Sequence, residues 1–174
     1  QLFKANKVTP YFGTGKLLKG NSVEITGPDG TKQTISATNV ILASGSVPIE
    51  LPFAKFDNKM ILDNAGALDL AEVPKRLGVI GAGVIGLELG SVWKRLGADV
   101  TILEALPDFL SVADADVAKV AAREFAKQGL TIKLGAKLTK AEIKKKEVAL
   151  TYEDKDGAHE LVVDKLLVAV GRRA

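Results

Sequence analysis

The feature that most constrains this chain is a glycine-rich turn between an apolar run and a helical pattern. The residues Gly81-Ala82-Gly83-Val84-Ile85-Gly86 directly follow Leu77–Ile80, and apolar residues at helical spacing continue to Leu96. Gly81 permits a tight turn from strand to helix, Gly83 lets a phosphate approach the backbone, and Gly86 allows the helix to pack closely on the sheet. The start of a helix offers unpaired N–H groups to an anion. We therefore predict that this turn binds the pyrophosphate of a dinucleotide.

An acidic residue supplies a second signal. Glu104 follows the buried strand pattern Val100–Leu103 and lies 18 residues after Gly86. A carboxylate at this position accepts hydrogen bonds from the adenosine ribose and would repel a 2′-phosphate. The next residues, Ala105-Leu106-Pro107, contain no base that could hold such a phosphate. The sequence therefore predicts a site for NAD rather than NADP. The alternative to a dinucleotide site is an ordinary glycine-rich turn followed by an incidental glutamate.

The order of strands and helices after residue 75 predicts the α/β class. Two helical patterns, over 84–96 and from Asp114 or Asp116 to Gly129, alternate with apolar strands. This order indicates a Rossmann-like, doubly wound parallel sheet with helices on its faces. Three β runs between 141 and 163 predict an antiparallel β-meander, and 166–170 predict the last strand. In the second helix, Val117 and Val120 share one apolar face.

The residues before 75 form two further stretches. Two alternating β runs flank Pro28-Asp29-Gly30, which predicts a hairpin, and the apolar run Val40–Ala43 predicts a buried strand. The stretch from 47 to 74 holds three of the six prolines and predicts a connector with one short helix. We therefore expect three parts: residues 1–46, a connector over 47–74, and a dinucleotide-binding domain over 75–174.

Composition excludes several kinds of site. The 174 residues include no cysteine and one histidine, His159, which excludes disulfides, a cysteine nucleophile and a histidine-rich metal site within them.

The net charge is only +3 and no basic face emerges, so we expect no nucleic-acid partner. No apolar run approaches the roughly 18 residues of a membrane helix, so we expect no membrane span. Because the chain starts at Gln1 and its one methionine is Met60, we expect a piece of a longer protein.

The segment Leu77–Ala105 closely resembles the dihydrolipoamide dehydrogenases, a group within the flavoprotein pyridine nucleotide-disulfide oxidoreductase family. Three other segments fit recurring segments of that family in the same order: Gly13–Lys16, Val40–Ser46 and Ala169–Arg173. The resemblance implies that 1–46 is the rear part of an FAD-binding domain. It also implies that 75–174 is the NAD-binding domain inserted into it, so that the cofactors are NAD and FAD.

The resemblance also assigns roles to single residues. It implies that Leu138 lies near the adenine of NAD and that the segment from Ala169 to Arg172 closes over the nucleotide. It places Gly15 near the adenosine of FAD and the segment Ala43-Ser44-Gly45 close to that cofactor, with Ser44 replacing the commoner threonine. Glu88 gains an electrostatic role beside the flavin, paired with a lysine that this chain does not contain. The candidate NAD residues are then Gly81, Ala82, Gly83, Val84, Ile85, Gly86, Glu104, Leu138, Ala169, Val170, Gly171 and Arg172.

The resemblance describes a larger parent enzyme. It implies a homodimer that oxidises dihydrolipoyl groups of 2-oxoacid dehydrogenase complexes and passes electrons through a disulfide and FAD to NAD⁺. Such a protein is cytoplasmic in bacteria or lies in the mitochondrial matrix, and is not secreted. The alternatives are a related NAD(P)H flavoenzyme (a transhydrogenase, an NADH oxidase or a mercuric reductase) or a stand-alone, non-catalytic nucleotide-binding module. Surface left exposed without the other domains predicts self-association.

We expect this chain alone to be catalytically silent. The family's redox disulfide and its His–Glu acid/base pair have no counterpart among these residues, since cysteine is absent and His159 is predicted to lie in a polar hairpin turn. The purified chain should therefore produce no NADH from dihydrolipoamide and NAD⁺, measured by absorbance. Dihydrolipoamide-dependent formation of NADH would contradict the expectation.

Overall fold

The computed structural model describes residues 1–174, which divide into two compact units, Gln1–Ser44 and Gly45–Ala174. The first unit holds a short helix and an antiparallel sheet in the order β1-β2-β3. Its elements are α1 (Leu2–Ala5), β1 (Thr14–Leu18), β2 (Ser22–Thr26) and β3 (Lys32–Ser36). The predicted hairpin is confirmed as β2 and β3, which pair in antiparallel register around the turn at Asp29 and Gly30.

The predicted strand over Val40–Ala43 is wrong. These residues form no strand in the structure, and the side chains of Ile41 and Leu42 are 90% and 73% exposed. A strand exists only where a neighbouring strand accepts and donates its backbone hydrogen bonds. Within the described residues, β1, β2 and β3 pair only with one another, so the apolar run has no such neighbour.

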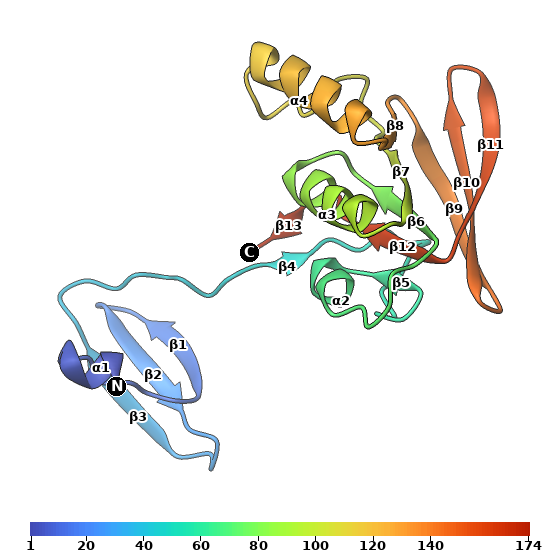
Figure 1. The fold of residues 1–174 in the computed structure, drawn as a ribbon. Helices are drawn as coiled ribbons and strands as arrows, with labels where there is room; N and C mark the ends of the chain where they lie inside the picture. The colour runs from blue at the N-terminus through green and yellow to red at the C-terminus, as the bar shows by residue number, and fades with distance from the viewer. The chain divides into compact units, whose positions relative to one another are not determined.

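A five-stranded parallel sheet forms the centre of the second unit (Figure 1). Its order is β5-β12-β6-β7-β8, and every neighbouring pair runs parallel. The strands are β5 (Ile61–Leu62), β6 (Arg76–Ile80), β7 (Asp99–Leu103), β8 (Thr131–Lys133) and β12 (Lys165–Val168). The predicted β-α-β-α-β order is confirmed. The last strand ends at Val168, two residues before the predicted end.

Alternating side chains of the sheet pack against two different layers. Leu77, Val79 and Val100 belong to a core shared with α2 (Asn64–Leu68) and α3 (Val84–Arg95). Ile80 and Leu103 point into a second core, which they share with the predicted antiparallel meander. The meander consists of β9 (Lys137–Lys144), β10 (Glu147–Asp154) and β11 (Gly157–Val163). Helices therefore cover one face of the sheet and the meander covers the other, instead of helices on both faces (Figure 1).

The helix α4 (Ala115–Lys127) begins as predicted but buries less than its pattern suggests. The carboxylate of Asp114 accepts a hydrogen bond from the Asp116 N–H at 3.0 Å and so caps the helix. Val117 and Val120, however, are 59% and 51% exposed. Only the later part of α4 reaches the helical core, where Phe125 packs. The apolar face of this helix is thus covered at one end only.

The stretch predicted as a connector is packed into the second unit. Besides β5 it contributes α2, whose first turn is capped by Asp63 accepting from the Gly66 N–H at 2.7 Å. A two-stranded antiparallel ribbon joins β4 (Val47–Pro48) to β13 (Arg172–Arg173) at the end of the chain. Residues far apart in the sequence are thereby brought beside the sheet.

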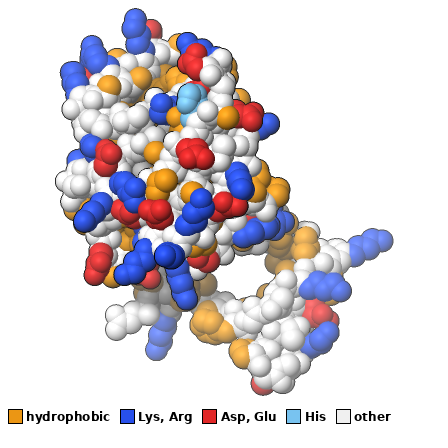
Figure 2. Space-filling view, turned by 90° about the vertical axis from the view of Figure 1, so that its right-hand side faces the viewer, with side chains coloured by type: hydrophobic (Ala, Val, Ile, Leu, Met, Phe, Trp, Pro, Cys, Tyr) orange, Lys and Arg blue, Asp and Glu red, His pale blue; other side chains and the backbone are white.

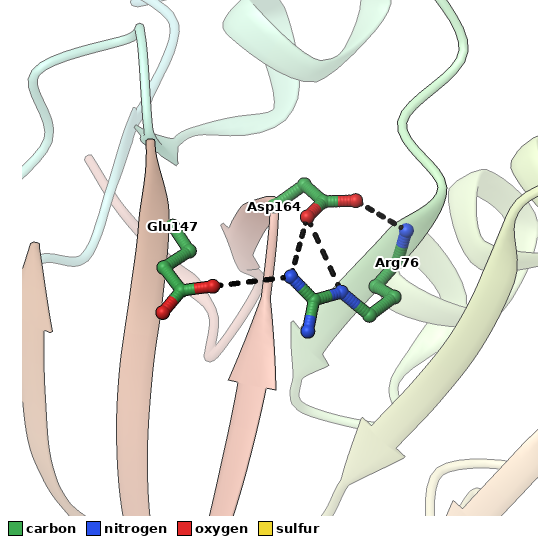
Figure 3. Close-up of polar contacts among 3 residues, drawn as sticks. All are labelled: Arg76, Glu147 and Asp164. Carbon is green, nitrogen blue, oxygen red and sulfur yellow. Dashed lines mark hydrogen bonds and ion pairs between the residues drawn. The ribbon is translucent and has the colours of Figure 1, made fainter. Parts of the chain in front are cut away.

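An ion-pair network joins the antiparallel meander to the first residue of β6 in the parallel sheet (Figure 3). The guanidinium of Arg76 in β6 donates to Asp164 at 2.7 and 3.2 Å, and to Glu147 of β10 at 3.3 Å. The Arg76 N–H also donates to Asp164 at 2.8 Å. Burial raises the pKa of Asp164, but the hydrogen bonds and the charge of Arg76 together lower it by more than burial raises it, so the net pKa lies below its usual value. The same hydrogen bond raises the pKa of Arg76.

The outer surface of the meander carries charges of both signs, interleaved rather than gathered in one block (Figure 2). One of its ion pairs joins Lys140 and Glu142 at 2.7 Å along β9. No helix in the structure has the length and apolar character that crossing a membrane requires.

Replacing Asp164 with Asn should destabilise the second unit. We expect a loss of about 1–2 kcal/mol in the free energy of unfolding at pH 7, because a charge-assisted pair is lost in a half-buried place. A carboxylate whose pKa is lowered on folding stabilises the fold above its ordinary pKa of 3.8, and that contribution disappears as the pH falls through the lower native pKa. Urea denaturation at several pH values should therefore show the difference from wild type at pH 5–8 and its decline below about pH 4.

Glu147→Gln is the matched control. Its contact with Arg76 is longer, at 3.3 Å, and both side chains are more than 40% exposed, so its loss should cost less. Equal losses in the two variants, or a loss in Asp164→Asn that does not change with pH, would contradict the assignment.

Candidate functional site

A cleft opens where β6, β7 and β12 end. Its volume is about 520 Å³. In open α/β sheets, ligands bind outside the carboxyl ends of the strands, which is the position of this cleft. All the candidate NAD residues line it except Gly86: Gly81, Ala82, Gly83, Val84, Ile85, Glu104, Leu138, Ala169, Val170, Gly171 and Arg172. The fold therefore brings together residues that are spread over more than half of the sequence.

The first glycine of the turn is required by its backbone and by its surroundings. Gly81 has φ +100°, a conformation that residues with a side chain rarely adopt. A Cβ on Gly81 would lie 2.6 Å from the carbonyl oxygen of Ala169. The Gly81 N–H donates to Leu103 O at 2.8 Å, and the Ala169 N–H donates to Ile80 O at 2.8 Å. The turn is thus clamped between the ends of β7 and β12.

The other two glycines differ sharply in their surroundings. A Cβ on Gly86 would lie 2.1 Å from the carbonyl oxygen of Gly81, so this glycine lets α3 approach the turn. Gly83 stands at the N-cap of α3, and no atom lies within 4 Å of the Cβ it lacks. Gly86 therefore serves packing inside the protein. Gly83, which lines the cleft, leaves open space beside the helix start.

Glu104 lies at the end of β7 and ties the two loops of the cleft together. One of its carboxylate oxygens accepts from the Ala82 N–H at 2.7 Å, and the other accepts from the Leu106 N–H at 2.9 Å. Its backbone donates to Lys133 O and accepts from the Ala136 N–H. The carboxylate is half-buried and lines the cleft. Its orientation is therefore fixed before any ligand is present.

The opposite end of the cleft is closed by the ribbon of β4 and β13. Arg172 donates from Nε to the Ser46 hydroxyl at 2.8 Å and from Nη1 to Asn64 Oδ1 at 2.7 Å, and Nη2 bonds to Ser46 O. Gly171 has φ +124° and its carbonyl accepts from the Ile49 N–H at 3.0 Å. Because β6 lies between β12 and β7 in the sheet, Arg172 and Glu104 stand at different ends of the cleft.

The meander supplies the remaining wall. Leu138 of β9 is buried and pairs with Tyr152 in register. Sequence reasoning missed several residues that line the same cleft, notably Pro48, Asn64, Asp108, Leu110, Ser111 and Val112. Most of these belong to the loop after Glu104. The sequence signal for them was their place directly after the strand that carries the acid, since such loops border the ligand in open α/β sheets.

Other candidate residues lie away from this cleft. Glu88 is exposed on α3, does not line the cleft and makes no side-chain hydrogen bond or ion pair in the structure. Gly15, Ala43, Ser44 and Gly45 are also exposed and line no part of the cleft. The proposed FAD contacts and the role of Glu88 stay predictions.

The lone histidine and tryptophan have structural surroundings. His159 lies in β11 rather than in a turn, stacks on Tyr152 and pairs with Asp154 at 2.8 Å. Hydrogen bonds from the Asp156 N–H and from His159 lower the pKa of Asp154. Trp93 is buried in the helical core, and its indole N–H has no partner. No group of three or more acidic or histidine side chains is placed to hold a metal ion.

Comparisons with known proteins identify the family. The family model described as pyridine nucleotide-disulphide oxidoreductase matches residues 1–174. The dihydrolipoyl dehydrogenase of Cupriavidus necator is 52% identical over 98% of this chain, and the mitochondrial dihydrolipoyl dehydrogenase of Schizosaccharomyces pombe is 44% identical over 98%. The crystal structure of LpdA from Mycobacterium tuberculosis superimposes with a TM-score of 0.84 at 27% identity, over 97% of this chain and 38% of that one.

The chain spans only about a third of the length of these curated relatives, 36% and 34% respectively. The resemblance inferred from the glycine-rich turn and the three other segments is nevertheless confirmed over the whole chain. The chain belongs to the pyridine nucleotide-disulphide oxidoreductase family.

Proposed function

We propose that residues 45–174 bind NAD and that the chain is the NAD-binding portion of a dihydrolipoyl dehydrogenase. The observation that carries the proposal is the convergence of the glycine-rich turn and Glu104 on one cleft. At the Glu104 end the lining includes no lysine or arginine, because Arg172 is its only cationic residue and stands at the other end. This distribution favours a dinucleotide with a free 2′-hydroxyl group.

The residues of the cleft fit a dinucleotide in three places. Open space beside Gly83 leaves room for a pyrophosphate at the start of α3, where N–H groups are free to donate. Glu104 would accept hydrogen bonds from the adenosine ribose through lone pairs that Ala82 and Leu106 do not use. Leu138 and Ala136 offer an apolar wall to the adenine, and residues 169–172 would enclose the nicotinamide half.

In the whole protein this portion would position a nucleotide rather than react itself. We infer that the parent takes electrons from dihydrolipoyl groups through a disulfide and FAD, and that NAD⁺ accepts them as hydride. The chain's own residues hold the nucleotide and fix its orientation. Identity of 52% to a dihydrolipoyl dehydrogenase supports this reaction over those of the related flavoenzymes.

The remaining parts of the proposal concern the parent. Gly15, Ala43, Ser44 and Gly45 would contact FAD, and Glu88 would act on the flavin side through its charge. The parent would be a homodimer that serves 2-oxoacid dehydrogenase complexes. It would work in the bacterial cytoplasm or the mitochondrial matrix, since named relatives include bacterial and mitochondrial enzymes.

The nucleotide preference can be tested by titrating NADH and NADPH into the purified chain. We expect NADH to bind more tightly, and Glu104→Ala to weaken NADH binding about tenfold or more, because hydrogen bonds to a charged acceptor are lost. NADPH affinity should stay the same or increase. Fluorescence of the bound reduced nucleotide measures both affinities.

Glu104→Gln separates charge from loop geometry. It keeps one oxygen that can accept from the Ala82 N–H, but its NH2 group cannot accept from the Leu106 N–H and the negative charge is lost. The preference for NADH should therefore fall, with a loss of melting temperature smaller than that of Glu104→Ala. If wild type binds neither nucleotide in the micromolar to millimolar range, the proposal fails for this chain. An unchanged preference in both variants would remove Glu104 from the site.

The two later glycines provide a matched pair of variants. Gly86→Ala should lower stability by about 1–3 kcal/mol, because its Cβ would meet a backbone oxygen at 2.1 Å. Gly83→Ala should fold with nearly unchanged stability, since its Cβ enters open space. It should still weaken NADH binding about tenfold or more, because the methyl group would occupy the place of the phosphates. Thermal unfolding and NADH titration of both variants test this, and normal binding by Gly83→Ala would exclude phosphates from that space.

A further inference from the structure

Building on the proposed NAD site, we propose that Asp108 is a second specificity-determining residue, which acts with Glu104 to reject nucleotides that carry a 2′-phosphate. Asp108 lies in the loop that follows β7, four residues after Glu104, and both residues line the cleft. Nothing in the sequence pattern singled it out. In this role Asp108 discriminates between nucleotides and takes no part in the transfer of hydride.

The carboxylate of Asp108 is free, unlike that of Glu104. Glu104 already accepts from two backbone N–H groups, one on each oxygen. Asp108 is exposed and makes no hydrogen bond or ion pair with any residue of the chain. No ion pair therefore offsets its charge, which lies at the border of the cleft.

The loop holds Asp108 in this place through contacts on both sides. Before it, the Leu106 N–H donates to Glu104 and the Leu106 carbonyl accepts from the Gly135 N–H at 2.9 Å. After it, the Phe109 ring meets Phe125 of α4 edge-on, with centroids 6.4 Å apart. Phe109 also packs against the helical core. Asp108 thus lies between two anchored residues, so its charge stays at the cleft instead of moving away with a free loop.

The charges along the cleft are arranged unevenly. Its charged lining residues are Glu104, Asp108 and Arg172, and both acids lie on the β7 side. Arg172 follows β12, two strands away from β7 in the sheet, and a separation of two strands is about 10 Å. A 2′-phosphate on an adenosine bound beside Glu104 would therefore meet two carboxylates and no cation. The free 2′-hydroxyl of NAD carries no charge and escapes this repulsion.

Repulsion predicts an effect on one nucleotide only. Asp108→Asn should tighten NADPH binding about two- to fivefold, because a screened carboxylate near a phosphate dianion contributes a modest energy. NADH affinity should change less than twofold. The gain for NADPH should shrink as salt is raised to about 0.5 M, since the Debye length then falls to about 4 Å and screens the repulsion between exposed charges.

Two smaller probes locate the effect at the adenosine end. Adenosine 5′-monophosphate and adenosine 2′,5′-bisphosphate lack the nicotinamide half, so Arg172 and the ribbon do not contribute to the comparison. Calorimetric titration of both into wild type and Asp108→Asn should show the same selective gain for the bisphosphate. Asp108→Glu should keep the wild-type ratio. Asp156→Asn, the same chemical change at an exposed hairpin turn away from the cleft, is the matched control and should also keep it.

The outcomes separate this inference from the proposed function. If wild type binds NADH but Asp108→Asn leaves the ratio of NADPH to NADH affinity unchanged, the inference is wrong and the NAD site stands. If Asp108→Asn weakens NADH binding severalfold, Asp108 is a direct ligand and the repulsion is wrong. If wild type binds none of the four nucleotides, the proposed function fails for this chain and the inference fails with it.

Discussion

The close approach of three backbone segments around Gly81 is the constraint on which the cleft depends. A side chain on Gly81 would collide with the carbonyl of Ala169, and one on Gly86 would collide with the carbonyl of Gly81. The ends of β6 and β12 and the start of α3 therefore meet without intervening side chains. This contact directs the N-terminus of α3 at the space beyond the strands. The anion-binding character of that space follows from backbone geometry more than from any charged group.

Glu104 connects this backbone geometry to selectivity. The same carboxylate that faces the cleft also accepts from Ala82 in the glycine-rich turn and from Leu106 in the following loop. A residue with two such bonds cannot rotate freely, so its remaining lone pairs have fixed directions. Loop position and ligand preference are therefore set by one side chain. For this reason a neutral variant that keeps an acceptor oxygen is more informative than a truncation.

The sequence predicted the parts of this fold whose cause is local. The strands and helices between 76 and 133, the cap at Asp114 and the meander all follow from periodicity and turn chemistry. The failures concern long-range partners. Val40–Ala43 has the composition of a buried strand but no neighbour to pair with, and Val117 and Val120 have the spacing of a buried face but only part of α4 meets the core. An apolar pattern indicates which side chains a segment can bury, but it does not show whether another segment is present to pack against them.

The candidate site shows the same division. The glycine-rich turn and Glu104 were predictable because their spacing reflects one strand, one helix and the next strand. The loop residues Asp108 and Ser111 were not, because their position at the cleft depends on contacts with segments more than fifteen residues away. Gly135 holds the loop by a backbone hydrogen bond, and Phe125 holds it through the Phe109 ring. The β7 side of the cleft is therefore a tertiary structure built on a locally encoded turn. The distribution of charge on this side of the cleft therefore depends on the three-dimensional position of the loop and cannot be predicted from sequence spacing.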